Sequence, residues 1–188
     1  MSGASQQILK RVAAMAVAFS AGVTPMAAAE LAQIPEDVLE RLIEPDELAN
    51  IDETDREQLL SVLALDTRAS VRARTAISLQ FLSPQLSPRI ESMLEQLAAD
   101  PAPGVRQVLA GILGPVMARM PALDRTCLIG SWSASPSEHE RYVIASALGW
   151  PFDAVGVRSA LAALSEDASP TVRAAAHRSS NRRAQRGA

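Results

Sequence analysis

The sequence predicts an all-α fold, an α-solenoid of about four short helical hairpins. Of the 188 residues, 48% are hydrophobic but only 3% are aromatic, and a core of Ala, Leu, Val and Ile suits close-packed helices better than a β-sandwich. No segment keeps the alternation of apolar and polar residues that indicates a strand. A group of residues recurs at intervals of 32 to 35 positions, a period typical of repeat proteins.

Residues 1–29 have the pattern of a secretory signal peptide. Lys10 and Arg11 precede the uncharged stretch 12–29, which ends in Ala27 and Ala29 at the spacing of a cleavage site. We expect the segment to be removed, the mature chain to begin near Glu30, and the protein to be periplasmic or secreted, with no integral membrane segment left. If the segment instead forms a first helix of the domain, the protein is cytoplasmic.

Residues 30–53 are predicted to form acidic helices that cap the N-terminal end of the repeats. Residues 30–66 contain twelve acids and two arginines, a net charge of −10, whereas residues 67–188 contain nine acids and fourteen arginines, a net charge of +5. Residues 35–49 suit one or two short helices, and Thr54 and Glu57 have the spacing of a capping box. The basic half could meet an acidic partner, or the charges could serve only solvation and internal ion pairs.

Residues 54–183 contain four copies of one hairpin pattern. Each copy has an apolar-periodic helix, a turn rich in Asp, Pro, Ser and Gly, and a second helix that begins near a Val-Arg pair. In three copies an Asp precedes the Arg by six residues: Asp66 and Arg72, Asp100 and Arg106, Asp167 and Arg173. Arg141 keeps this register in the third copy, where Ser135 and Glu140 replace the Asp and the Val.

Helix start and stop signals agree with these hairpins. Ser137 and Glu140 have capping-box spacing, and Ser169-Pro170 offers an N-cap followed by Pro at the first helical position. Gly149-Trp150-Pro151 ends a helix. Residues 184–188 are expected to form a basic, disordered tail.

The pattern L-x-x-L-x-x-D-x-x-x-x-V-R-x-x-A resembles HEAT repeats, particularly the short bacterial repeats of phycobilisome-lyase-like proteins. The resemblance covers residues 54–183. It implies a right-handed, armadillo-like superhelix with the first helices on the convex side and the second helices on the concave side. It also implies that the repeated Asp and Arg form a structural ladder, in which each Arg reaches an Asp of its own or of an adjacent repeat.

Helical geometry supports this structural role. The Arg and the Ala four residues later share a face with the buried positions, so the Arg is half-buried and needs a carboxylate partner. The third copy lacks the Asp, and we expect irregular stacking or a partner site there.

The face of the second helices opposite the packed stripe is the candidate binding surface. The projection selects four residues: Arg74, Gln107, Tyr142 and Arg178. Solenoids bind extended partners on the concave side, although ordinary exposed side chains would show the same pattern. Trp132 and Trp150 flank the third copy, and we expect them to pack rather than to anchor a partner.

The sequence contains no motif for catalysis, cofactor binding or a metal site. It lacks G-x-S-x-G, H-E-x-x-H, a P-loop and G-x-G-x-x-G. One Cys and two His exclude an internal disulfide and a Cys-based zinc site, and Cys127 lies in an apolar stretch where a small buried residue is expected. We therefore predict that the protein is not an enzyme and needs no cofactor or metal.

The predicted function is an exported adaptor or scaffold that binds a protein partner through its concave face. The first alternative is a cytoplasmic accessory protein of lyase or chaperone type, because bilin lyases are among the HEAT-like proteins that the pattern resembles. A minor alternative is nucleic-acid binding through the Arg-rich C-terminal half, which predicts strongly salt-dependent binding. HEAT-like DNA glycosylases fit less well, since this chain is acidic and poor in aromatic residues.

Overall fold

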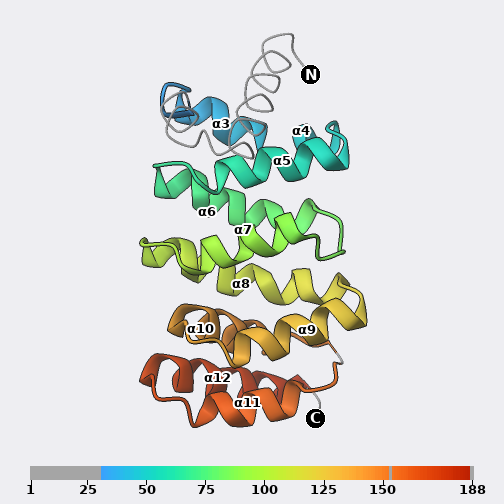
Figure 1. Ribbon diagram of the computed structural model, residues 1–188, viewed down its shortest axis with the longest axis vertical. Coiled ribbons are helices and arrows are strands. Elements are labelled where there is room, and N and C mark those ends of the chain that lie inside the picture. The colour runs from blue at the N-terminus through green and yellow to red at the C-terminus, as the bar shows by residue number, and fades with distance from the viewer. Residues whose placement is uncertain (1–30, 153, 187–188) are drawn as a thin grey trace. The chain divides into compact units, whose positions relative to one another are not determined.

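The computed structural model describes residues 31–152 and 154–186 (Figure 1). This part of the chain contains ten α-helices, one 3-10 helix and no β-strand, so the all-α prediction is confirmed. None of its helices is long and apolar enough to cross a membrane. The predicted signal peptide, residues 1–29, lies outside the described residues. The described residues divide into two compact units, 31–83 with 88–97, and 84–87 with 98–152 and 154–186.

The first unit is built from short helices. They are α3 (Glu36–Leu42), α4 (Pro45–Ala49), α5 (Glu53–Leu63), α6 (Ala69–Ser78), the 3-10 helix η1 (Leu79–Phe81) and most of α7 (Pro88–Ala98). Helix α6 packs against α5 and α3, and α4 contacts α3 and η1. Two short helices therefore form within residues 35–49, as predicted.

The start of α5 differs from the prediction. Asp52 is the N-cap, and its Oδ1 accepts the backbone N–H of Asp55 at 3.0 Å. This hydrogen bond lowers the pKa of Asp52. Because the helix begins at Glu53, Thr54 is already its second residue, and the predicted capping box of Thr54 and Glu57 is wrong.

Arg56 holds the ends of three segments of the first unit together. Its Nε donates to the carbonyl of Leu48 at 2.9 Å, its Nη2 to Ile51 at 2.8 Å and its Nη1 to Phe81 at 2.8 Å. The last carbonyls of a helix have no partner within the helix. A single guanidinium here satisfies carbonyls of α4, of the loop after it and of η1.

The second unit has two layers of helices. It contains α8 (Pro103–Arg119), α9 (Ala122–Ser133), α10 (Glu138–Ala147), α11 (Val157–Ser165) and α12 (Pro170–Arg186). Helix α10 lies between α8 and α12, while α9 contacts α10 and α11 (Figure 1). One layer therefore consists of α8, α10 and α12, and the other of α9 and α11.

Glycines allow close packing within the layer of α8, α10 and α12. A Cβ added to Gly114 would lie 2.7 Å from the Cβ of Trp150, and one added to Gly149 would lie 2.8 Å from the Oγ of Ser179. These distances are too short for any side chain. Gly114 therefore lets α8 meet the loop after α10, and Gly149 lets that same loop meet α12.

The predicted N-caps of two helices in this unit are confirmed, although at Ser137 the reciprocal bond of a capping box is replaced, because its N–H donates to Ser135 Oγ. Ser137 Oγ accepts the N–H of Glu140 at 3.4 Å at the start of α10. Ser169 Oγ accepts the N–H groups of Thr171 and Val172, at 3.2 and 3.4 Å, at the start of α12. Helix α10 ends at Ala147, just before residues 149–151.

The prediction of a disordered tail from residue 184 is wrong for residues 184–186. Helix α12 continues to Arg186, and residues 187–188 lie outside the described part. The extension is stabilised from within the unit, because Arg183 binds backbone carbonyls of the α10–α11 loop. Arg, Ala and Gln also have high helix propensity.

Candidate functional site

The repeated arginine builds the same turn in all four copies by binding the backbone. Its Nη1 donates to the carbonyl six residues earlier, which is the carbonyl of the repeated Asp or Ser. The bonds are Arg72 to Asp66 at 2.7 Å, Arg141 to Ser135 at 2.8 Å, Arg173 to Asp167 at 2.6 Å, and Arg106 to Asp100. In three copies the same Nη1 also reaches the next carbonyl, at 2.9 to 3.0 Å. The arginine thus satisfies carbonyls that the preceding helix and turn leave open.

The repeated Asp closes the turn with its side chain. Its Oδ1 accepts the backbone N–H two residues later at 2.8 Å in the copies of Asp66, Asp100 and Asp167. In the third copy Ser135 Oγ accepts the N–H of Ser137 at 3.0 Å. A serine hydroxyl therefore replaces the carboxylate, and the irregularity expected for the third copy does not extend to its turn.

One ion pair connects consecutive copies in the second unit. Arg141 Nε lies 2.6 Å from Asp167 Oδ2, and its Nη2 lies 3.2 Å from Oδ1. The two side chains are 17% and 8% exposed. The hydrogen bonds from Arg141 lower the pKa of Asp167, and those same bonds raise the pKa of Arg141. The predicted contact between an Arg and the Asp of an adjacent copy occurs here, but Arg106 and Arg173 form no ion pair with a carboxylate of the described residues.

The first copy uses its carboxylate differently. Both oxygens of Asp66 accept from Arg68, at 2.8 Å from Nε and 2.7 Å from Nη2. Arg68 Nη1 also donates to the carbonyl of Ile34 at 2.8 Å. Arg68 therefore fixes the segment before α3 to the α5–α6 turn, a role that the repeat pattern did not reveal.

Arg141→Ala should destabilise the protein more than Arg106→Ala. Loss of Arg141 leaves the mostly buried Asp167 carboxylate unpaired and should cost about 3 kcal/mol, whereas loss of the Arg106 turn contact should cost about 1 kcal/mol. Chemical denaturation measures both free energies of unfolding. Equal losses would contradict the additional role of Arg141.

The contribution of Asp167 to the free energy of unfolding should disappear in acid. The pKa of Asp167 is lower in the folded state than in the unfolded chain, so its stabilisation is complete above the unfolded pKa of about 4 and is lost as the pH falls through the folded value. The free-energy difference between wild type and Asp167→Asn should therefore be largest near neutral pH and shrink below about pH 4. A difference independent of pH would contradict the ion pair.

Three of the four predicted binding residues surround one hollow in the second unit. Gln107 of α8, Tyr142 of α10 and Arg178 of α12 line a space of about 240 Å³ together with Arg182. Its remaining lining is small: Ala110, Gly111, Ser146, Ala175 and Ser179. We call this space the α8–α10–α12 hollow.

The fourth predicted residue, Arg74, lies in the first unit and is paired. It lines a separate pocket of about 450 Å³. Its Nε lies 3.0 Å from Glu40 Oε1, and its Nη1 lies 3.2 Å from Glu44 Oε1. Two carboxylates therefore already neutralise Arg74, in contrast to the arginines of the hollow.

The α8–α10–α12 hollow is rich in hydrogen-bond donors and lacks a carboxylate. Among the described residues, no Asp or Glu lies within ion-pair distance of Arg178 or Arg182. Gln107 and Arg178 are exposed and Tyr142 is half-buried. A Cβ added to Gly111 would meet no atom within 4 Å, so this glycine opens onto free space. The hollow can accept an acidic group.

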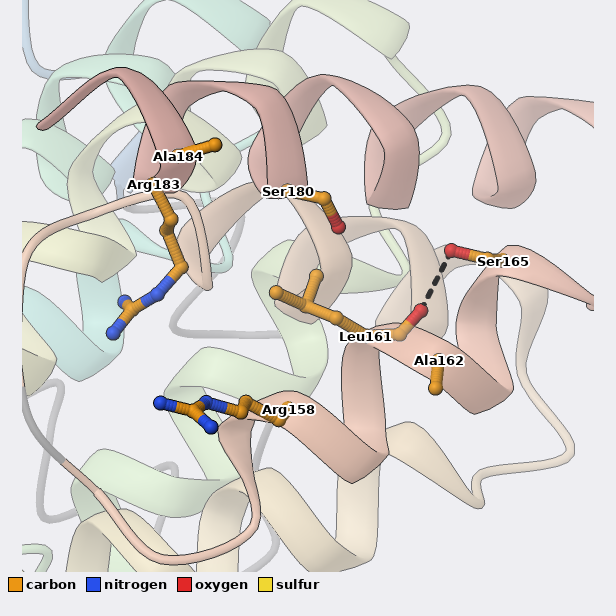
Figure 2. A pocket seen from close by; sticks show the side chains of 7 residues that line it. All are labelled: Arg158, Leu161, Ala162, Ser165, Ser180, Arg183 and Ala184. Carbon is orange, nitrogen blue, oxygen red and sulfur yellow. Dashed lines mark hydrogen bonds between the residues drawn. The ribbon is translucent and has the colours of Figure 1, made fainter. Parts of the chain in front are cut away.

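A larger pocket lies between α11 and α12 (Figure 2). Its volume is about 530 Å³, and Figure 2 shows the guanidinium groups of Arg158 and Arg183 at the same end of it. Arg183 is fixed by bonds to the carbonyls of Leu148, Trp150 and Phe152 at 3.3, 2.7 and 3.0 Å. Its guanidinium also lies 5.9 Å from the centre of the Phe152 ring.

The predicted burial of Cys127 and of the two tryptophans is only partly confirmed. Cys127 is exposed, so the prediction of a buried thiol is wrong; Leu128 and Ile129 provide the buried face of α9 at this point. Trp132 is buried, as expected, but Trp150 is 40% exposed and lies beneath the Arg186 guanidinium at 5.7 Å.

The described part of the chain contains no cluster of three or more His, Cys, Asp or Glu residues that could hold a metal ion. Compared with protein-family models, curated proteins and solved structures, the chain gives no match.

Proposed function

We propose that the protein is a HEAT-like α-solenoid that acts as a non-catalytic interaction module. The repeated turn supports this proposal, because the same arginine-to-carbonyl bond recurs in four copies. The two layers of helices in the second unit are also what stacked hairpins produce. A scaffold built from such hairpins presents side chains of successive second helices along one surface.

The partner in this proposal is a protein with an acidic segment. The observation that carries it is the meeting of Gln107, Tyr142 and Arg178 with Arg182 around one hollow without a carboxylate. Arg binds carboxylates with strong, charge-assisted hydrogen bonds, and Tyr and Arg are the residues most often found at the energetic centre of interfaces. An Asp or Glu side chain of the partner would supply the missing acceptors.

Two alternatives remain distinguishable from this proposal. Helix α12 contains no Asp or Glu over Pro170–Arg186, which favours nucleic acid as a second candidate ligand. An accessory protein of lyase or chaperone type would use the same hollow from the cytoplasm. Export of the protein, as the N-terminal pattern predicts, would place it away from both nucleic acid and bilin chemistry.

Photo-cross-linking from the hollow tests the proposal. A photoreactive amino acid at Gln107 should form an adduct with a protein partner in the native cell, through a segment that contains Asp or Glu. Gly111→Leu projects a side chain into the hollow and should weaken capture about tenfold or more, without loss of stability, because Leu has a higher helix propensity than Gly.

Gly130→Leu is the matched control. Gly130 lies on α9, outside the hollow, and a Cβ there also meets no atom within 4 Å. This variant should capture the partner as well as wild type does. Equal capture by Gly111→Leu and Gly130→Leu would contradict the proposal, and so would adducts formed only with nucleic acid.

A further inference from the structure

Helix α12 carries a repeated arginine whose carboxylate partner is missing. Arg141 and Arg173 occupy the same position in consecutive copies, and Nη1 of each binds two carbonyls of its own turn. Arg141 uses its remaining edge, Nε and Nη2, to bind both oxygens of Asp167. Among the described residues, no acceptor meets the same edge of Arg173. A planar edge with two parallel N–H groups fits a carboxylate.

The side chains around this edge form one surface, which we call the α11–α12 face. On α12, Arg173, Ser180 and Ala184 are spaced by seven and four residues and therefore share one side of the helix. Helix α11 contributes Arg158, Leu161, Ala162 and Ser165 to the pocket beside Ser180 and Ala184 (Figure 2). The face thus combines small apolar side chains and hydroxyls with guanidinium groups at both ends of α12.

Among the described residues, no carboxylate lies within ion-pair distance of the guanidinium groups on this face, although the charge of Arg173 helps to lower the pKa of Asp167. Arg158 lies in the first turn of α11, where the helix dipole favours an acid. The three carbonyl bonds of Arg183 use its Nη1 and Nη2, and its Nε–H has no acceptor in the described part of the chain. Together with Arg173, three guanidinium groups can therefore still bind an acidic group from outside.

We propose that the α11–α12 face is a second interaction surface, which binds a segment of a partner protein through an Asp or Glu. That carboxylate binds Nε and Nη2 of Arg173 as Asp167 binds Arg141, and apolar residues of the segment cover the exposed Ala162. The surface is separate from the α8–α10–α12 hollow and extends the proposed function to a second site.

The turn carboxylates of a second copy of this chain could not reproduce the Arg141–Asp167 contact at Arg173. The turn carboxylates that could occupy Arg173 are already engaged: Asp66 by Arg68, and Asp167 by Arg141. Asp100 is 4% exposed and accepts the N–H of Ala102. A partner with its own available carboxylate is therefore the expected occupant. The structural alternative is a polar surface that only closes the stack of hairpins.

Cross-linking from Ser180 with two lysine variants tests this inference. Ser180 lines the pocket, and a photoreactive residue there should form an adduct with a partner segment that contains Asp or Glu. Arg173→Lys keeps the charge but loses the planar edge, and should reduce the adduct about tenfold. Arg106→Lys is the matched control, because Arg106 makes the same turn contact but lies on α8.

The melting temperatures of the two lysine variants should agree, which would show that both proteins fold. Equal adduct yields in Arg173→Lys and Arg106→Lys would overturn the inference. An adduct with a second copy of the chain, an adduct segment without a carboxylate, or no adduct would also overturn it and leave a polar end surface. Gly111→Leu should not change the Ser180 adduct, so failure of this inference is distinguishable from failure of the proposed function.

Discussion

Satisfaction of backbone carbonyls at helix ends is the constraint on which this structure depends. Each helix leaves its last carbonyls without an intrahelical partner, and the described part of the chain, with ten α-helices, has many such groups. Arginines supply the donors: Arg56 spans three segments of the first unit, and Arg183 binds three carbonyls between α10 and α11. The core contains few aromatic side chains. These arginine–carbonyl bonds therefore help to fix the positions of the helices, as large buried rings do in other folds.

The repeated turn is the most regular case of an arginine that binds backbone carbonyls at a helix end. The arginine binds the carbonyls, and the Asp or Ser binds an N–H of the same turn, so neither role requires an Arg–Asp ion pair within the copy. Ser135 can therefore replace the Asp without changing the turn. The remaining guanidinium edge is then available for a carboxylate of another segment. Arg141 binds Asp167 of the same chain through this edge, whereas the same edge of Arg173 is left for a carboxylate of a partner in the proposal above.

Much of the local structure could be predicted from the sequence, because helix periodicity and capping depend on near neighbours. The repeat register brought Gln107, Tyr142 and Arg178 onto one face, and the structure places them around one hollow. The partner choices of long side chains were not predictable. Arg68 and Arg183 each donate to backbone carbonyls more than thirty positions away, and such contacts depend on how helices pack. The exposure of Cys127 was missed for the same reason.

The most direct test of the arginine-based turn is NMR of the guanidinium groups in the intact protein. A guanidinium whose Nη1 is hydrogen-bonded to a carbonyl of the turn rotates slowly about its Cζ–Nη bonds and should show separate Nη signals. We predict separate signals for Arg72, Arg106, Arg141 and Arg173, and averaged signals for the exposed Arg119 and Arg158. Averaged signals for the four repeated arginines would contradict the account, because they would show that the carbonyls of the turns are not held by these side chains.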